Sequence, residues 1–181
     1  GEKARDKIFN LIYLKKRESK KKYKHLPNSE THHCFGCSPI NPSGLQMSFY
    51  TNDAAVFSEI TVPKHLCGWN NLIHGGVLST ILDEIMSWAA IYLLKRITLT
   101  KSMTIDYLKP VYIGQSLKVE GKVLELKGKH EAVMEGILSN SDGTICTRST
   151  ANFAIFSPAV AKRLGIANEE HLNWFERIYN I

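Results

Sequence analysis

The stretch IHGGVLSTILDEI, residues 73–85, places a histidine and two glycines directly before an apolar run that contains two acids. The apolar residues of this run recur at helical spacing, which predicts a core helix over residues 76–94. Its core-facing side chains would be Leu78, Ile81, Leu82, Ile85 and Met86. Asp83 and Glu84 lie in the middle of the run. Burying an unpaired carboxylate is costly, so an acid at this place indicates a specific role.

The composition is that of an ordinary soluble globular protein. The chain has 181 residues, with 44% hydrophobic and 22% charged residues, enough for one domain with its own core. We expect no membrane span, because the nearest apolar run, residues 77–94, is interrupted by Asp83 and Glu84. The N-terminal residues are charged where a signal peptide would need an apolar stretch, so we expect a cytoplasmic protein.

The formal net charge of +6 is concentrated in one segment, residues 15–24. Such a segment can form an electrostatic patch for a polyanion or an anionic cofactor. A solvated helix face followed by a basic linker explains the same pattern, and we favour it. Tyr13 and Tyr23 are too few for a base-stacking surface, so we expect no nucleic-acid partner.

A CxxC motif, formed by Cys34 and Cys37, lies next to two histidines in THHCFGC. These residue types can supply zinc ligands. A structural zinc site usually needs a second pair at similar spacing, whereas Cys67 and Cys146 each stand alone. We therefore expect reduced, buried thiols and no metal.

The predicted elements follow the order hairpin, long helix, antiparallel meander. Residues 2–24 have the pattern of a basic helix, and residues 25–44, rich in proline and glycine, that of a loop. Asp142-Gly143 is typical of a hairpin turn. The predicted strands cover residues 45–50, 54–62, 98–108, 116–126, 130–139 and 144–156, and a helical tail covers residues 159–178.

One antiparallel sheet wrapped around one buried helix satisfies this order and predicts an α+β fold. It also explains why the central helix is apolar on nearly every side. The predicted organisation is a basic helical extension over residues 1–28, a central domain over residues 29–158 and the helical tail over residues 159–181.

Three motifs resemble one family. GWNNLIHGGVLSTILDE resembles the helix start of hotdog-fold acyl-CoA thioesterases of the phenylacetate-degradation (PaaI-like) type, which carry a histidine–glycine–glycine triplet and an aspartate nine residues after the histidine. Here His74 and Asp83 have that spacing. CFGCSPINPSGLQMSFY is similar to the CFxCGxxNPxGLxLxF motif of one branch, with Ser38 in place of a glycine. MTIDYLKPV is similar to the family's strand that ends in a tyrosine, two further residues and a proline. The resemblance covers residues 34–156 and implies a hotdog fold.

The chemistry of thioester hydrolysis fits the start of this helix. A helix N-terminus leaves backbone N–H groups unpaired and carries a partial positive charge, and glycine lets a substrate approach closely. The N–H of Gly75 or Gly76 could therefore meet the negative charge that grows on the thioester carbonyl oxygen, an oxyanion hole worth about 3–4 kcal/mol per donor. Asp83 lies about 10–14 Å further along the helix, too far to act on the same carbonyl from the same chain.

The resemblance implies a solution through a second copy. In hotdog dimers two such helices pack side by side, and each site takes glycine amides from one copy and the acid from the other. This implies a homodimer, or a dimer of dimers (homotetramer). Burial at such a seam would raise the pKa of Asp83 toward the range of a base. Asp83 would then activate water or attack the carbonyl directly, and the residues do not distinguish these roles.

Further roles are implied by the resemblance. Thr100, seven residues before Tyr107, has the place of a residue that orients the water, although an ordinary strand threonine explains it as well. His74 would shape the turn by hydrogen bonding rather than shuttle protons. Many relatives carry an asparagine or glutamine six or seven residues before the histidine, but here those positions hold glycine and cysteine. Asn71 is a displaced candidate for that donor.

CoA phosphates require cations. Candidates on or beside the predicted strands are Lys101, Lys109 and Arg148, although nothing in their spacing distinguishes them from ordinary surface charges. The leading interpretation is an acyl-CoA thioesterase that uses no cofactor beyond its CoA substrate. Two alternatives stay open. A hotdog dehydratase or hydratase would need a catalytic histidine such as His65, and a non-catalytic acyl-CoA-binding regulator would fit the missing loop amide.

Overall fold

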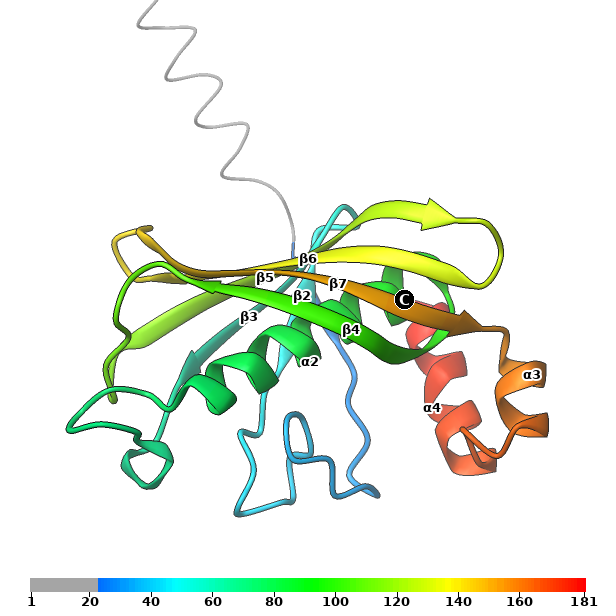
Figure 1. Cartoon of the computed structure of the whole chain (residues 1–181). Coiled ribbons are helices and arrows are strands. Elements are labelled where there is room, and N and C mark those ends of the chain that lie inside the picture. Colours follow the sequence, from blue (N-terminus) through cyan, green and yellow to red (C-terminus); the bar gives the residue numbers. More distant parts are fainter. Residues whose placement is uncertain (1–22) are drawn as a thin grey trace, which may run out of the picture.

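The structure is a computed structural model, and it describes residues 23–181 (Figure 1). The described residues form one seven-stranded antiparallel sheet in the order β1-β2-β3-β5-β6-β7-β4, with one long helix, α2, packed on it. The strands are β1 Lys24–Leu26, β2 Phe49–Thr51, β3 Val56–Thr61, β4 Ile97–Tyr107, β5 Ser116–Lys127, β6 Glu131–Asn140 and β7 Ile145–Phe156. The helices are the short 3-10 turn η1 Lys64–Leu66, then α2 Gly75–Leu94, α3 Pro158–Arg163 and α4 Glu169–Tyr179.

Helix α2 is enclosed on two sides. It contacts strands β3 to β7 on one side, while the loop of residues 27–48 lies against its other side (Figure 1). This is why its buried residues are not confined to one stripe: Val77, Leu78, Ile81, Leu82, Ile85, Met86, Trp88, Ala89, Ala90 and Tyr92. By length and composition alone, α2 is apolar enough to cross a membrane. The expectation that Asp83 and Glu84 make the run too polar for a membrane span was therefore wrong by these two criteria. In this fold α2 is the core helix.

Glycines in the sheet let α2 lie close to the strands. A Cβ at Gly121 of β5 would come 2.5 Å from the carbonyl oxygen of Ile85, and one at Gly136 of β6 would come 3.2 Å from the Leu82 side chain. The helix backbone can therefore pack directly on the middle of the sheet, which fixes the position of Asp83 relative to the edge strand β4.

The predicted α+β hotdog fold and the order of its elements are confirmed. The meander strands agree with the prediction to within a few residues, and the turn at Asp142-Gly143 has the positive φ of +86° that only glycine adopts freely. The strand predicted over residues 45–50 is wrong in its first part, since it is extended only from Phe49 onward. Gln46 has a φ of +50°, which interrupts an extended chain.

Two terminal predictions need correction. The predicted basic helix of residues 2–24 lies outside the described residues except for its end, where Lys24 begins β1 and pairs with Thr51 of β2. Residues 24–26 therefore belong to the sheet and not to a helical extension. The predicted single helical tail is two helices, because Gly165 turns the chain with a φ of +70° and Asn168 caps α4.

Candidate functional site

The backbone N–H groups of Gly75 and Gly76, at the start of α2, have different hydrogen-bond partners. His74 is the N-cap, and its Nδ1 accepts a hydrogen bond from the Gly76 N–H at 2.9 Å. This cap satisfies one of the N–H groups that a helix start leaves without an intrahelical partner. Among the described residues, no acceptor meets the Gly75 N–H. Gly75 is therefore the amide that is free to bind a ligand.

Tyr107, the last residue of β4, ties the sheet edge to the start of α2. Its hydroxyl donates to the Gly75 carbonyl oxygen at 3.0 Å and lies 2.9 Å from Ser79 Oγ. The sequence predicted no role for Tyr107 beyond its spacing from Thr100. It shows a tyrosine at the end of a predicted strand, and only the fold shows that this end meets the helix.

Two surface hollows flank Gly75. One, of about 490 Å³, is lined by residues of the loop before α2, including Trp69 and His74. The other, of about 320 Å³, is lined by Gly75, Tyr107 and Lys109 among others. Gly75 therefore lies between two hollows of the surface.

Asp83 is half-buried on α2 and faces the edge strand β4. Thr100 Oγ1 of β4 donates a hydrogen bond to Asp83 Oδ1 at 2.6 Å. The strand has a register shift between Thr100 and Ser102, and bulges of this kind often re-aim a side chain beside a site. Burial raises the pKa of Asp83 above that of an ordinary aspartate, and the hydrogen bond from Thr100 opposes this shift. The structure thus brings together two of the residues that the sequence analysis selected.

Removing the Thr100 hydroxyl is expected to move the pH dependence of any reaction that uses the Asp83 carboxylate. In Thr100→Val the opposing hydrogen bond is lost, so the pKa of Asp83 rises further and the acid limb of kcat/KM shifts to higher pH. The variant should be slower at acidic pH and approach the parent at alkaline pH. Thr100→Ser keeps the hydroxyl and serves as the control. An unchanged acid limb in Thr100→Val would contradict the role of this contact.

Glu84 faces the loop of residues 27–48 instead. Its Oε1 lies at hydrogen-bond distance, 3.2 Å, from Cys34 Sγ, and its burial raises its pKa to about 8. A hydrogen bond with the Cys37 thiol lowers the pKa of Cys34, and the same contact raises the pKa of Cys37. The charge on each of the three groups therefore depends on the protonation of its neighbours. This cluster could not be predicted from the sequence, because Cys34 and Glu84 are fifty residues apart in the chain.

Gly36 is required where this loop crosses Glu84. A Cβ at Gly36 would overlap the Cγ of Glu84. We expect Gly36→Ala to lower the free energy of unfolding by about 1–3 kcal/mol, the usual effect of overpacking, measured by urea denaturation. In a double-mutant cycle, the same change made in a Glu84→Ala background should be much less damaging. Equal damage in both backgrounds would place the conflict elsewhere.

The four cysteines differ in exposure. Cys37 and Cys146 are buried, Cys34 is half-buried and Cys67 is exposed, and none of them forms a disulfide within the described part of the chain. The predicted reduced thiols agree with this, but the prediction that they are buried is wrong for Cys67.

The remaining predicted residues are not gathered at one place. The Asn71 side chain is exposed, while its backbone carbonyl accepts a hydrogen bond from Ile113 at 2.9 Å. Lys101 is paired with Glu131 at 2.7 Å. Lys109 lines a hollow beside Gly75, and Arg148 is exposed on β7. His65, the histidine that a dehydratase would need, is exposed in η1.

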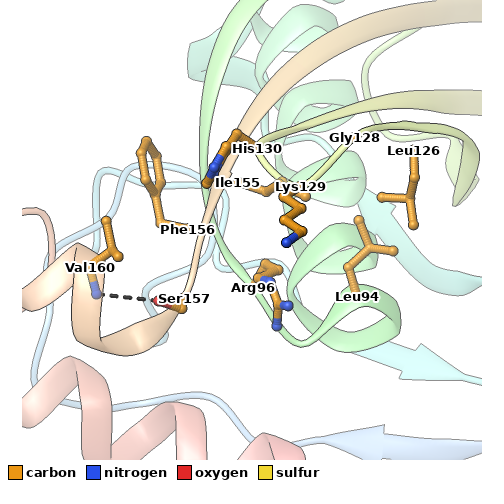
Figure 2. Close-up of a pocket in the computed structure, with 10 residues that line it drawn as sticks. All are labelled: Leu94, Arg96, Leu126, Gly128, Lys129, His130, Ile155, Phe156, Ser157 and Val160. Atoms are coloured by element: carbon orange, nitrogen blue, oxygen red, sulfur yellow. Dashed lines mark hydrogen bonds between the residues drawn. The ribbon is translucent and has the colours of Figure 1, made fainter.

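A further hollow, of about 410 Å³, lies at the other end of α2 (Figure 2). Arg96, Lys129 and His130 give it a basic lining, and no carboxylate lines it among the described residues. Ser157 Oγ in its wall caps α3 by accepting a hydrogen bond from the Val160 N–H at 3.4 Å. This hollow therefore lacks the carboxylate that the helix start has in Asp83.

Comparison with known proteins relates the central part of the chain to one protein family. The family model described as the thioesterase superfamily matches residues 70–147, from the loop before α2 to the first residues of β7. Over this segment the chain is similar to the thioesterase superfamily. The matched segment contains the helix start, Asp83 and Thr100, so the predicted family resemblance is confirmed.

Individual relatives agree with this family. The chain is similar to the acyl-coenzyme A thioesterase THEM4 of Rattus norvegicus, with 30% identity over 94 residues, which is 52% of this chain and 40% of the relative. The chain thus spans about two fifths of the length of the curated relatives it matches. A hypothetical thioesterase of Streptococcus pneumoniae, solved with coenzyme A, has a TM-score of 0.54 at 22% identity, covering 57% of this chain and 82% of that one. The E. coli PaaI protein has a TM-score of 0.56 at 18% identity, covering 62% and 81%. These structures support the hotdog fold.

Proposed function

We propose that this chain is an acyl-CoA thioesterase that hydrolyses a CoA thioester to a free acid and CoA and works as a homodimer. Asp83 is its general base or nucleophile, and the Gly75 amide is its oxyanion donor. The observation that carries the proposal is the half-buried Asp83 held by Thr100 on a helix whose first amide is free. A thioesterase-superfamily match, relatives named as acyl-coenzyme A thioesterases and a structural neighbour solved with coenzyme A support the same substrate class.

The reaction needs one base and one oxyanion donor. When Asp83 acts as a base, its carboxylate takes a proton from water while the water oxygen bonds to the thioester carbonyl carbon. Negative charge passes to the carbonyl oxygen, where the Gly75 N–H and the positive end of α2 stabilise it. The carbon–sulfur bond then breaks, and the CoA sulfur leaves with the electron pair and takes up a proton. When Asp83 attacks directly, a mixed anhydride forms and water hydrolyses it to the same products.

One active site needs residues from two copies of the chain, because Gly75 and Asp83 are too far apart along α2. Gly75 and Asp83 are eight residues apart on α2, about 12 Å by rise, so one chain does not place both at one carbonyl. A twofold axis that passes near Ser79, midway between them, would bring Gly75 of each copy opposite Asp83 of the other if the two helices lie antiparallel. Ser79 is only half-buried in the single chain, as that arrangement requires.

The edge strand β4 offers a surface for the second copy. It is one of the two outermost strands of the sheet, and its free edge has no partner among residues 23–181. Leu99, Tyr107 and Leu108 on or beside it are each about half exposed, at 48%, 53% and 53%. A long unpaired edge with apolar side chains is a template for another chain, so covering it in a homodimer removes an aggregation hazard. A further dimer of dimers would be compatible with this interface.

Lys109 is the best-placed of the three proposed CoA-binding cations, since it lines the hollow beside Gly75. Lys101 would have to leave Glu131 to reach a phosphate, and Arg148 lies on β7. We therefore propose Lys109 as the main phosphate contact and the other two as weaker ones.

The test is CoA release from a panel of acyl-CoA esters, read with a thiol reagent, together with the mass of the protein in solution. Catalytic turnover with at least one ester by a dimer or tetramer supports the proposal. Hydration of an enoyl-CoA without CoA release would favour a dehydratase or hydratase instead. Tight acyl-CoA binding without turnover would favour a binding protein, and a monomer that hydrolyses acyl-CoA would contradict the shared site.

A further inference from the structure

A second group of reactive side chains lies where the loop of residues 27–48 meets α2. The sulfur atoms of Cys34 and Cys37 and a carboxylate oxygen of Glu84 lie within 4.8 Å of one another. Cys34 and Glu84 are half-buried, and Cys37 is buried. The thioester chemistry proposed above uses none of the three.

The loop holds this geometry through its own hydrogen bonds. The Cys34 N–H donates to His32 Nδ1 at 3.2 Å, and Ser38 Oγ donates to the His32 carbonyl oxygen at 2.6 Å. The Asn28 side chain donates to the Cys37 carbonyl oxygen. Gly36, between the two cysteines, is pressed against Glu84 so closely that a Cβ would overlap its side chain. The cluster is therefore built by the fold and is not a chance meeting of flexible surface groups.

We propose that Cys34, Cys37 and Glu84 bind one divalent ion of the zinc class, which fastens the loop to α2. Two sulfur ligands favour a borderline-soft ion such as Zn²⁺ over Mg²⁺ or Ca²⁺, which prefer oxygen ligands. The fourth position faces a hollow of about 350 Å³ whose lining includes His171 and Ser87. Water or one of these two side chains completes the coordination.

The distances are close to those that zinc requires. Zn–S bonds of about 2.3 Å and Zn–O bonds of about 2.0–2.2 Å in a tetrahedron separate two sulfurs by about 3.8 Å and a sulfur from an oxygen by about 3.5 Å. Cys34 Sγ and Glu84 Oε1 are 3.2 Å apart, and the widest separation in the cluster is no more than 4.8 Å. Small rotations of the side chains therefore suffice to place all three around one ion.

The surroundings also need a cation. Two thiolates and a carboxylate would bring three negative charges together, and no lysine or arginine is among the described residues that line the adjacent hollow. Without an ion, the cluster must keep protons to avoid buried, unpaired charge. A metal ion replaces those protons, as it does in sites where ligand deprotonation and binding are coupled.

This proposal revises the criterion used in the sequence analysis. A second cysteine pair was expected to complete a zinc site, and none exists at suitable spacing. The third ligand comes instead from the middle of α2, and only the fold brings Glu84 to the CxxC loop.

The test measures metal binding and does not depend on enzyme activity. The whole chain is reduced, stripped with a chelator, incubated with Zn²⁺ and analysed by elemental mass spectrometry. We expect one zinc per chain, and X-ray absorption should show two sulfur neighbours at about 2.3 Å and nitrogen or oxygen neighbours at about 2.0 Å. Cys34→Ser, Cys37→Ser and Glu84→Gln should each weaken zinc binding by at least about tenfold. Cys67→Ser, which changes an exposed thiol outside the cluster, should still bind one ion.

Four results would each overturn the proposal. The first two are no tightly bound zinc in the reduced parent and a zinc spectrum without sulfur neighbours. The other two are loss of zinc in Cys67→Ser alone and a Cys34–Cys37 disulfide that persists under reducing conditions. Circular dichroism checks the folding of each variant. The stoichiometry and absorption spectrum of the parent decide the question even where a variant does not fold.

Discussion

Asp83→Asn is expected to lower kcat for CoA release by at least about a hundredfold, the usual range for removing an acid–base group. Asparagine has nearly the shape of aspartate, and its amide oxygen can still accept the hydrogen bond that Thr100 donates at 2.6 Å. The fold and the association of the chains should therefore be kept, and only the proton acceptor or nucleophile is lost. The measurement is steady-state kinetics with the best ester of the acyl-CoA panel.

Asp142→Asn is the matched control for this change. Asp142 is an exposed aspartate in the turn between β6 and β7, outside the strand proposed to meet the second copy, and asparagine can still accept the hydrogen bond from the Thr144 N–H. It should stay within about twofold of the parent, as surface substitutions usually do. Full activity in Asp83→Asn would reject Asp83 as the catalytic acid–base group and leave the reason for its burial open to a structural explanation.

Gly75→Pro is expected to have the second large effect, a fall in kcat of about a hundredfold to a thousandfold. Proline has no backbone N–H, so this change removes the proposed oxyanion donor itself. Its ring is tolerated at the first position of a helix, and His74 before it has the extended backbone, φ −60° and ψ 136°, that a residue preceding proline prefers. The helix should therefore form normally.

Gly75→Ala separates the lost hydrogen bond from steric effects. It keeps the N–H, and its Cβ would meet the Tyr107 hydroxyl at 3.5 Å, an ordinary contact. We expect the alanine variant to be at least about tenfold faster than the proline variant. If both are equally slow, bulk at this position and not the amide is what matters.

The regular part of the fold was predictable because local patterns and the global fold agree there. The apolar spacing of α2 and the alternation of the meander strands come from burial on one or more faces, and these signals lie in consecutive residues. The short strand β1 was not predictable, because its three residues, which are followed by a proline, are too few to show a pattern. The break in the tail was missed because the pattern of apolar residues continues across Gly165, whose positive φ ends α3.

The candidate site, like the fold, was predictable from the sequence only in part. Asp83 and the glycines could be selected from one short motif, and Thr100 from its spacing to Tyr107. That Thr100 meets Asp83 depends on the pairing of β4 beside α2, which no local pattern shows. The contact of Glu84 with Cys34 depends likewise on the path of a long loop. The different tasks of the two glycine amides follow from a single hydrogen bond of His74, which only the folded helix start shows.

The central claim is that one active site takes Gly75 from one copy and Asp83 from the other, and mixing two inactive variants tests it most directly. Asp83→Asn and Gly75→Pro chains, each with its own affinity tag, are combined and allowed to exchange subunits. Half of the random dimers are then mixed, and each mixed dimer has one intact site of two, so we expect about one quarter of the parental activity to return. Mixed dimers isolated through both tags should have about half the parental rate. Mixed dimers that are isolated in this way and remain inactive would contradict the shared site.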